Sequence, residues 1–580
     1  MPDAEQVSAE VASHAVGGRR GGRQRGSRAR HHRRTVFGVR WLPWFLAEKK
    51  AEMLVALEVQ APWSRLLLAG TKTVETRRYP LPSHLVGQRL WMLETPAGAI
   101  GVSALASHVA LSDAPLGPRI TGSFVVTACV QYGSYADWTA DRHRHCVQPD
   151  VDAVLQLTDP SRDWNSTPLF GWVVANPATE ELILPNDVIL SRVYRSLFTL
   201  SLSIPTVRLN LDSHEIPSAV LEAVAKQCRH VGFLRVSLAG EHDAARIVES
   251  AHDATRDFFS LPDPVKEAAS KSRIEKTNES FCSTGYRGAE QGANNTGGRE
   301  SFSVVRPDYD GLSCDSYFAS ARGRKKFSVH PDPQVPWPSS THVPTFQSMI
   351  TAYYALMQKL SAPLFHLFAR LLDLPHRDTL HALARRHTSS LMLSNHRPGF
   401  AGRRVLTPHA DITCFTVLSH DARADASGSD CLEVANPYYG RDARLGRWIR
   451  LAPPAAPVSG QPEAPFFLVN VGQVMERWSG GRLLATLHRV VRNRGEFPQV
   501  GPAPRRQALV YFQNVDYDTV LKVLQDGPPV NGANFEEDEM AEYEAKRMAS
   551  FYDGSDEMTV FNTYNQDVLY RLKDVVSLFQ

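Results

Sequence analysis

Several short stretches in the first third of the chain have patterns of hydrophobic and polar residues that predict β-strands. Residues 54–60 have an alternating pattern, which is typical of a half-buried strand. The residues that follow predict a helix between Pro62 and Gly70, because proline suits the first turn of a helix and glycine its end. Further strand patterns occupy residues 88–93, 122–130 and 171–175. Together they predict a small mixed β-barrel with one early helix, over residues 53–200.

Helical periodicity dominates residues 201–384. An amphipathic stretch at 219–229 predicts a helix that leads into a strand. Residues 254–266 predict a second helix that is stopped by prolines, and residues 344–374 predict a long third one. We expect these helices to form the N-terminal part of a larger domain that spans residues 201–535.

Strand-forming residues are concentrated farther on, over residues 385–525. The stretches 406–418 and 483–491 are rich in β-branched and aromatic residues. The tail, residues 536–580, begins with acidic residues and continues with helical spacing, including a second helix around 568–579. The expected fold class is therefore α+β and mostly β, with tail helices packed on the outside of the larger domain.

The composition is that of an ordinary globular protein. At 580 residues the chain is long enough for two to four domains, each with its own core. The seven cysteines are scattered and form no CxxC pair, so neither a zinc ribbon nor a disulfide framework is supported. No apolar run approaches the roughly 20 residues that span a bilayer. We expect a reducing intracellular location, in the cytoplasm or the nucleus.

The first 52 residues have a different character. Residues 11–47 contain no acidic side chain, and residues 18–34 are rich in arginine and glycine. Such a segment cannot bury enough apolar surface to fold alone, so we expect a disordered basic tail. Three interpretations stay open: an arm that contacts RNA through its arginines, a presequence for import into an organelle, or translation that begins at Met53.

Three His-x-Asp motifs are candidates for a metal site. Two of them, at His330 and His376, lie in a proline-rich segment and after a helix, and solvated loops explain them. The third, His409-Ala-Asp411, leads into a strand-forming run. Residues i and i+2 of a strand lie on one face, so His409 and Asp411 are able to reach the same ion.

A third ligand, His488, lies in the second strand-forming stretch. Two imidazoles and one carboxylate on one face of an ion form the facial triad of non-haem Fe(II) oxygenases. This geometry leaves open coordination positions for substrate and oxygen. The sequence therefore predicts an iron site made by His409, Asp411 and His488.

A longer series of landmarks accompanies these ligands. They are Ile204-Pro, His230-Val-Gly-Phe, Phe258-Phe-x-Leu-Pro and Gly285-Tyr, then Trp448, Val469-Asn-Val-Gly472, Ser479-Gly-Gly, His488-Arg-Val and Arg506. In this order, the chain from Ile204 to Leu524 resembles the isopenicillin N synthase-like branch of the 2-oxoglutarate- and Fe(II)-dependent dioxygenases. The resemblance implies a double-stranded β-helix (jelly-roll) core at residues 385–525, with helices around it.

The resemblance also implies a role for each candidate residue. His409, Asp411 and His488 match the metal ligands of that family. Arg506 matches the arginine that holds the distal carboxylate of 2-oxoglutarate through paired charge-assisted hydrogen bonds, with Arg505 as the alternative. The implied cofactors are Fe(II), 2-oxoglutarate as co-substrate, and O2. The implied products are succinate and carbon dioxide, with hydroxylation of a C–H bond as the default outcome.

Two positions near the co-substrate depart from the family pattern. Ala508 stands where the family has the serine of an Arg-x-Ser motif, and the lost hydrogen bond is worth roughly 0.5–1.5 kcal/mol. His396, in a Ser-Asn-His-Arg-Pro run, stands where the family has a tyrosine, and we expect it to take the place of that tyrosine. Elsewhere in the domain, Gln473 replaces a common aspartate after the Val-Gly pair.

The front region carries a second resemblance. Its Pro-Trp helix and the following Gly-x-Lys-x-x-Glu-x-Arg motif are matched by Pro62, Trp63, Gly70, Lys72, Glu75 and Arg77. In these residues, the segment 53–200 resembles the ASCH family, which is related to the PUA fold. The resemblance implies a cleft for RNA or a nucleotide-like ligand, faced by the last three of these residues. Some relatives with a similar lysine hydrolyse acylated pyrimidine nucleosides, but binding is the role that we expect.

Two simpler explanations compete in this front region. Lys72, Glu75 and Arg77 could instead be a salt-bridge group at the rim of the barrel, which would add little stability. The segment from Asp141 to Cys146 contains two histidines and a cysteine, but its spacing suits no usual zinc site. We expect a solvated loop there.

Three functions remain open from the sequence. The first is an Fe(II)- and 2-oxoglutarate-dependent oxygenase whose front domain binds RNA or a nucleotide. The second is an oxidase of a small metabolite, including one that does not use 2-oxoglutarate, with a separate front binding module. The third is a catalytically weak scaffold that mainly binds RNA. The intact triad and Arg506 favour an enzyme.

Overall fold

The computed structural model describes most of the chain from residue 54 to residue 524. The described residues are 54–97, 105, 108–110, 118–211, 216–238, 242–270, 284–288, 299–305, 335–385, 389–397, 404–421, 432–439, 441, 443–452, 466–491, 506–516, 519–524 and 538–539. The predictions for the basic tail, for the motif at His330, for Arg505 and for the C-terminal helices lie outside them. No helix within these ranges is long and apolar enough to cross a membrane.

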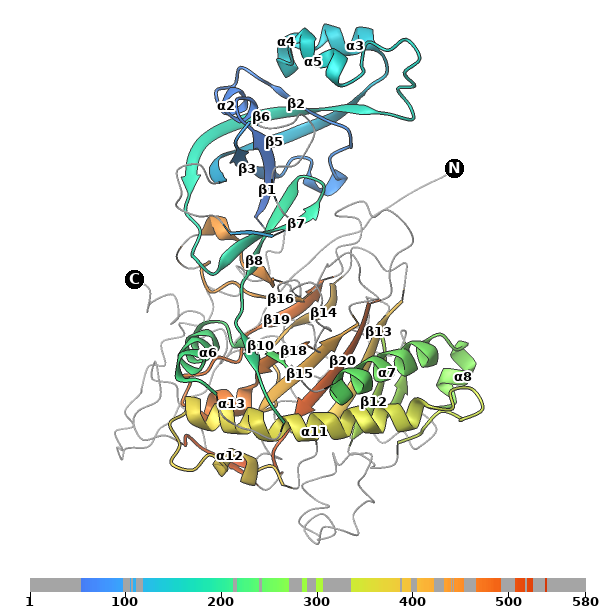
Figure 1. Ribbon diagram of the computed structural model, residues 1–580, viewed down its shortest axis with the longest axis vertical. Helices are drawn as coiled ribbons and strands as arrows, with labels where there is room; N and C mark the ends of the chain where they lie inside the picture. Colours follow the sequence, from blue (N-terminus) through green and yellow to red (C-terminus); the bar gives the residue numbers. More distant parts are fainter. Residues whose placement is uncertain are drawn as a thin grey trace, which may run out of the picture. The chain divides into compact units, whose positions relative to one another are not determined.

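The front domain is built on one twisted sheet with hydrogen-bonded order β8-β1-β3-β5-β6-β2 (Figure 1). Its strands are β1 (Val55–Gln60), β2 (Val74–Arg77), β3 (Arg89–Thr95), β4 (His108–Ala110), β5 (Arg119–Tyr132), β6 (Leu169–Leu182), β7 (Val188–Tyr194) and β8 (Leu197–Leu202). Leu57, Leu67, Phe124 and Trp172 form its buried core. All four strands predicted in this region are confirmed, whereas the closed PUA-like barrel stays a prediction.

The early helix is confirmed as α2 (Trp63–Leu68). Pro62 precedes its first residue, and Gly70 follows its last turn with a φ of +72°, a left-handed conformation that glycine adopts without strain. The helix packs Leu67 into the core of the sheet. The motif that follows then starts β2, so the helix and its glycine fix where Lys72, Glu75 and Arg77 lie.

The segment from Asp141 to Cys146 is not the solvated loop that the sequence predicted. Residues Arg142–His145 form helix α4, between α3 (Tyr135–Ala140) and α5 (Pro149–Val154), and His145 is completely buried. Its ring stacks on Trp138 with centroids 3.8 Å apart. One ring nitrogen accepts a hydrogen bond from Val147 N–H at 3.0 Å, so the other, Nε2, donates to the Trp138 carbonyl at 3.0 Å. The neutral imidazole satisfies both partners, which is why it is buried here.

We expect the front domain to lose stability in mild acid because of His145. Burial lowers the pKa of His145 to about 4 from the ordinary value of 6.5. The unfolded chain therefore binds this proton more readily than the folded one, so the contribution is complete above pH 6.5 and is lost as the pH falls towards 4. Thermal unfolding of the His145→Gln variant between pH 7 and pH 4.5 should show a weaker pH dependence than the unchanged chain. The exposed neighbour gives the control, since His143→Gln should keep the full dependence; an equal slope in all three proteins would contradict this assignment.

The larger domain contains an eight-stranded sheet of order β11-β12-β13-β20-β15-β18-β10-β9. These strands are β9 (Thr206–Arg208), β10 (Phe233–Ser237), β11 (Gly285–Arg287), β12 (Arg299–Val305), β13 (Ser390–His396), β15 (Phe415–His420), β18 (Phe466–Val471) and β20 (Arg506–Gln513). Facing it are β14 (Arg404–His409), β16 (Leu432–Ala435), β17 (Trp448–Leu451) and β19 (His488–Val491), in the order β14-β19-β16-β17 (Figure 1). This arrangement of two sheets is a jelly-roll core.

Helices cover the outer face of the eight-stranded sheet. They are α6 (Ser218–His230), α7 (His242–Phe259), α8 (Asp263–Glu267), α11 (Phe346–Leu371) and α12 (Thr379–Ala382). The long helix α11 runs beside the sheet (Figure 1). Its Leu364 and Phe368 belong to the same buried core as Phe415 and Tyr511 of the sheet. The predicted second helix is in fact two, since Pro262 lies between α7 and α8, and α7 begins earlier than its hydrophobic pattern indicated.

The two domains are joined by backbone hydrogen bonds. Strand β17 pairs in parallel with β8 of the front domain, with Arg450 opposite Ser201 and Leu451 opposite Leu202. The sheet that carries β14 and β19 therefore continues into the front sheet as one set of twelve strands. A shared core that includes Leu200, Leu202, Val434 and Ile449 covers the joint.

Candidate metal centre and co-substrate site

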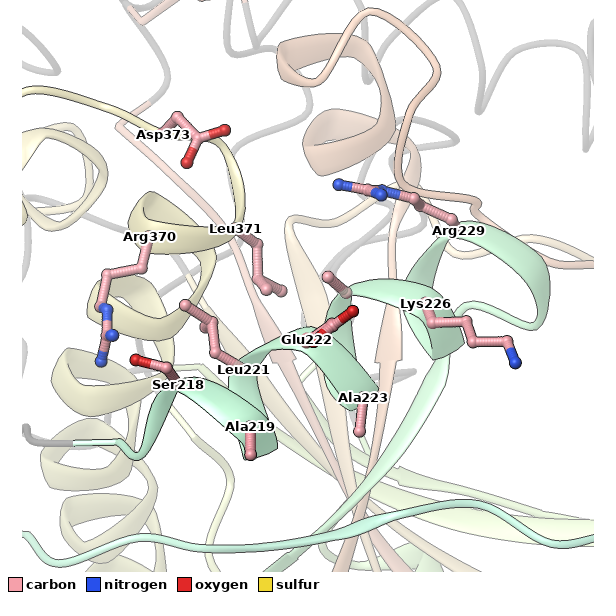
Figure 2. A pocket seen from close by; sticks show the side chains of 11 residues that line it. Ser218, Ala219, Leu221, Glu222, Ala223, Lys226, Arg229, Arg370, Leu371 and Asp373 are labelled. Atoms are coloured by element: carbon pink, nitrogen blue, oxygen red, sulfur yellow. The ribbon is translucent and has the colours of Figure 1, made fainter.

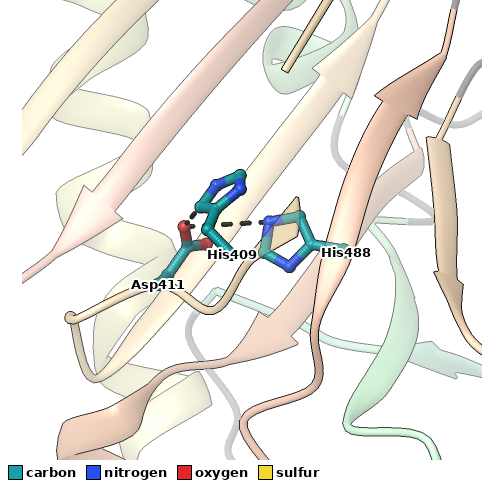
Figure 3. Close-up of side chains that lie close together, drawn as sticks. All are labelled: His409, Asp411 and His488. Atoms are coloured by element: carbon teal, nitrogen blue, oxygen red, sulfur yellow. Dashed lines mark ion pairs between the residues drawn. The ribbon is translucent and has the colours of Figure 1, made fainter. Parts of the chain in front are cut away.

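Three side chains converge between the two sheets of the jelly roll. His409, Asp411 and His488 each offer a ligand atom, and these atoms lie within 4.8 Å of one another (Figure 3). The Asp411 Oδ1 atom is 3.5 Å from Nε2 of His409 and 3.8 Å from Nε2 of His488. The two imidazole rings have centroids 4.4 Å apart. Two ring nitrogens and one carboxylate oxygen therefore face one small volume, and that donor set suits Fe(II).

The route by which Asp411 reaches this volume differs from the prediction. Strand β14 ends at His409, and Asp411 lies in the turn between β14 and β15, so the two ligands are not alternate residues of one strand. The turn is held by Gln473, whose amide donates to the Ala410 carbonyl at 2.9 Å and whose backbone N–H donates to the Asp411 carbonyl at 2.8 Å. His488 is the first residue of β19 and pairs across the sheet with His409.

The carboxylate of Asp411 is oriented by two neighbours on the opposite sheet. Thr416 Oγ1 and Asn470 Nδ2 both donate to Oδ2, at 2.6 Å and 2.8 Å. The other carboxylate oxygen, Oδ1, therefore faces the two imidazoles. Burial by itself would raise the pKa of Asp411, but His488, His409 and the Thr416 hydroxyl hold it well below the usual range of a carboxyl group. The side chain is therefore a carboxylate, the form that binds a metal.

His488 is fixed in the tautomer that a metal needs. Its Nδ1 lies 3.0 Å from the Thr486 carbonyl, which can only accept, so Nδ1 carries the proton and Nε2 has a free lone pair. Phe233 packs edge-on against the ring at 5.7 Å between centroids. Burial, with His409 nearby, lowers the pKa of His488 to about 4. The imidazole is accordingly neutral at physiological pH.

Removing the neighbours of Asp411 should weaken metal binding without removing a ligand. We expect Asn470→Ala to lower Fe(II) affinity by roughly 10–100-fold, as is usual for groups that orient a metal ligand. Thr416→Val, which keeps the shape of the side chain, should act in the same direction. Titration of the full-length chain with Fe(II) under anaerobic conditions measures both. Ser419→Ala provides the control because Ser419 lies on the other face of β15 and bonds His252; an unchanged affinity in Asn470→Ala would contradict the role.

The co-substrate candidates lie on the same inner face. His396 and Arg506 are directly opposite each other on β13 and β20, and the Arg506 guanidinium donates to Nε2 of His396 at 3.1 Å. Residues of the alternate face of these strands, such as Leu393 and Leu509, point the other way into the core with α11. The structure therefore brings Arg506 and His396 together at the inner face, as two neighbouring nitrogen-bearing side chains.

A buried charge cluster beneath His396 was not foreseen from the sequence. Glu300, only 1 % exposed, accepts hydrogen bonds from Lys266 and Tyr286 at 2.8 Å, from Arg397 at 2.9 Å and from Asn395 at 2.7 Å. Arg397 and Lys266 also pair with Asp263 of α8. The cluster fixes the end of β13 on the outer side, which holds His396 in place. Its members come from distant segments, so no local pattern marks them.

The front-domain candidates form a closed group. Glu75 pairs with Arg77 at 2.8 Å and with Lys72 at 3.5 Å. Lys72 is 2 % exposed and donates to the His145 carbonyl at 2.6 Å, while Arg77 donates to the Glu58 carbonyl at 2.8 Å. Burial lowers the pKa of Lys72, although Glu75 partly opposes this. The three residues are together, as the motif predicted, but their charges are turned towards one another, which matches the salt-bridge interpretation.

One surface groove lies away from both clusters. It runs between α6 and the end of α11, and Lys226, Arg229, Arg370 and Asp373 are among its lining residues (Figure 2). Arg370 is engaged there, since it donates to the Ile216 carbonyl at 2.8 Å. The residues that line the groove belong to the helices that cover the sheet and to the turn directly after α11. They include no residue of the triad.

Comparison with known proteins identifies the larger domain. Residues 388–514 match the 2OG-Fe(II) oxygenase superfamily, and residues 204–319 match the N-terminal region of the non-haem dioxygenases in morphine synthesis. The chain carries a 2-oxoglutarate-dependent dioxygenase domain. Its cofactors are Fe(II) and 2-oxoglutarate, and the matched segment 388–514 contains all three residues of the triad.

Several fungal relatives of the dioxygenase domain are known. The 2-oxoglutarate-dependent dioxygenase ecdK of Aspergillus rugulosus is 27% identical over 267 residues, which is 44% of this chain and 70% of that protein. The dioxygenase frbA of a Dothideomycetidae species is 24% identical, and the match covers 56% of this chain and 89% of that protein. One from Gibberella zeae is 31% identical over 205 residues, 33% of this chain, and there the match spans about half of the relative, 47%.

Solved structures of similar proteins include a full-length Neurospora crassa protein in complex with alpha-KG and thymine. It has a TM-score of 0.43 and 19% identity, and the match covers 60% of this chain and 97% of that one. The dioxygenase for auxin oxidation from rice has a TM-score of 0.38 and 20% identity, and the match covers 60% of this chain and 95% of that one.

Proposed function

We propose that the protein is an Fe(II)- and 2-oxoglutarate-dependent oxygenase that hydroxylates a C–H bond of a small organic substrate. The observation that carries the proposal is the convergence of His409, Asp411 and His488 inside the jelly roll, with ligand atoms within 4.8 Å. Both imidazole-bearing strands and the turn that holds Asp411 are fixed by hydrogen bonds within the barrel. The three ligands are therefore held in position by the fold before any metal binds.

Each residue has a distinct task in this proposal. His409, Asp411 and His488 would hold Fe(II), and the bound metal with 2-oxoglutarate and O2 supplies the oxidising power for C–H cleavage. Arg506 would bind the distal carboxylate of 2-oxoglutarate with its guanidinium fork. His396 accepts a hydrogen bond from that fork, so it orients Arg506 towards the barrel interior.

The apolar lining of the barrel has a task as well. Phe233, Leu418 and Leu468 belong to one hydrophobic cluster at the inner side of the sheets, and Phe233 is 1 % exposed. Such a lining excludes water from the reacting centre, which strengthens the electrostatic contacts to the co-substrate and protects reactive species from side reactions.

The test is co-substrate turnover by the full-length chain. We expect succinate to form from 2-oxoglutarate only when Fe(II) and O2 are present, and to stop when the metal is chelated. Undiminished turnover with a chelator would contradict the iron role. Oxygen uptake without succinate formation would instead indicate a small-metabolite oxidase that does not use 2-oxoglutarate. If neither oxygen uptake nor succinate formation were seen with any pool of candidate substrates, the RNA-binding scaffold would be the remaining interpretation.

For the front domain we propose the binding of RNA or a nucleotide-like ligand. The match of Gly70, Lys72, Glu75 and Arg77 to the ASCH motif supports this, together with the basic run at residues 18–34. Arg77 is the best probe because its side chain keeps 18% exposure. Arg77→Ala should weaken RNA retention in a crosslinking assay, whereas Arg78→Ala, on the exposed neighbour, should not. Equal retention by both variants would contradict the proposal.

A further inference from the structure

We propose that Ser394 supplies the hydroxyl that binds the distal carboxylate of 2-oxoglutarate, in place of the hydroxyl that is missing at Ala508. The proposal rests on the role given above to Arg506, because it places the carboxylate beside that guanidinium. It makes Ser394 a binding residue for the co-substrate, contributed by a different strand from the one that carries the family motif.

The register of β13 and β20 places Ser394 at the right position. The two strands are antiparallel, with His396 opposite Arg506 and Ser394 opposite Ala508. Directly opposite residues of an antiparallel pair project to the same face, with Cβ atoms about 4.5–5.5 Å apart. Ser394 therefore stands beside the methyl group of Ala508, two residues along the strand from the pair of Arg506 and on the same face.

That face of the sheet is turned towards the metal ligands. On the next strand, His420 lies opposite Ala508, and four residues back along the same face of β15 lies Thr416, which donates to Asp411. The alternate residues point away: Leu393 and Leu509 are fully buried in the core with α11. Ser394, Ala508 and Arg506 consequently line the interior that the triad faces.

Ser394 lies largely buried on the inner face of β13. The residue is 5% exposed, yet among the described residues its hydroxyl has no hydrogen-bond partner. Its oxygen is not one of the fully buried atoms that lack a partner, so it keeps some accessible surface and a ligand atom can reach it. A carboxylate bound by Arg506 on the inner face would give this hydroxyl a hydrogen-bond acceptor.

The chemistry of the carboxylate fits two donors of this kind. An ionised carboxylate offers about four acceptor positions, and a guanidinium fork fills two of them. One Arg506 nitrogen already donates to His396, so part of its capacity is used. A hydroxyl from Ser394 adds a donor from the side of the pocket where Ala508 has only a methyl group. The neighbouring strand thus restores what the family motif has lost in this chain.

The experiment measures co-substrate affinity rather than turnover. The full-length chain, loaded with Fe(II) under anaerobic conditions, is titrated with 2-oxoglutarate by calorimetry. Ser394→Ala should weaken binding roughly tenfold, as expected for a hydrogen bond to a charged acceptor. Ala508→Ser placed in the Ser394→Ala background should recover most of that affinity, because it returns a hydroxyl to the same pocket from β20.

Two controls separate this role from a structural one. The monocarboxylate 2-oxobutyrate has the same metal-chelating end but no distal carboxylate, so its affinity should be unchanged by Ser394→Ala. Ser303 lies on the same face of the sheet, on β12, and Ser303→Ala should not change the affinity for either ligand. Full 2-oxoglutarate affinity in Ser394→Ala, an equal loss for both ligands, or a failure of Ala508→Ser to restore binding would each overturn the proposal. If Arg506→Leu also leaves 2-oxoglutarate binding intact, the proposed role of Arg506 fails first.

Discussion

Replacing His409 with alanine should abolish succinate formation. The substitution leaves two ligands, Asp411 and His488, which still face the same volume but offer one imidazole and one carboxylate only. The loss should exceed the roughly 10–100-fold cost of removing a group that merely orients a ligand. It is measured as succinate released from 2-oxoglutarate at saturating Fe(II), with metal content determined on the same protein samples.

The chain supplies a matched control for this substitution. His376 and Asp378 form another His-x-Asp motif, but both are exposed and lie in the loop before α12, and Asp378 pairs with His366 instead. His376→Ala should therefore keep full succinate formation and full metal content. If His409→Ala retained its iron and its turnover while folding normally, the triad would not be the metal centre.

Replacing Arg506 with leucine should raise the KM for 2-oxoglutarate by about 100-fold or more. Removing one partner of a buried, hydrogen-bonded charge pair costs roughly 2–5 kcal/mol, much of it because the other charge stays unpaired. The chelating end of the co-substrate is untouched, so Fe(II) binding should be normal. The effect should therefore appear mainly in KM, followed by succinate formation over a wide range of 2-oxoglutarate concentrations.

Two other arginines, Arg229 on the surface and Arg505 next to Arg506 in the sequence, test whether the effect on KM is specific to Arg506. Arg229, exposed near the end of α6, lines the surface groove and not the barrel interior, and Arg229→Leu should leave KM unchanged. Arg505→Leu should also have little effect if Arg506 is the ligand. A normal KM in Arg506→Leu together with a raised KM in Arg505→Leu would transfer the role to Arg505.

Local patterns were enough to place most elements of this fold. The strand at Val55–Gln60, the helix between Pro62 and Gly70 and the long helix α11 follow directly from hydrophobic spacing and from the residues at their ends. Those signals are short-range, since each depends on residues within a few turns or alternate positions. The metal candidates were found because chemistry limits which side chains can hold Fe(II).

Features that depend on contacts between distant segments were beyond the sequence. The turn at Asp411 is set by Gln473, some sixty residues later, so the strand geometry inferred from spacing alone was wrong. His145 is buried because Trp138 and Val147 satisfy both of its nitrogens, which no zinc-like spacing rule addresses. The pairing of Ser394 with Ala508 is likewise a matter of strand register, which the local pattern does not encode.

Because β17 pairs with β8 through backbone hydrogen bonds, we do not expect the oxygenase barrel to form a stable domain without the front strands. A shortened protein that began at residue 203 would leave the edge of β17 without its partner strand and would uncover Val434, Ile449 and Leu451. Unprotected strand edges beside apolar surface recruit other chains into intermolecular sheets. Such a fragment would therefore be expected to precipitate even though every iron ligand is present in it, so insolubility after truncation would say nothing about the chemistry of the centre.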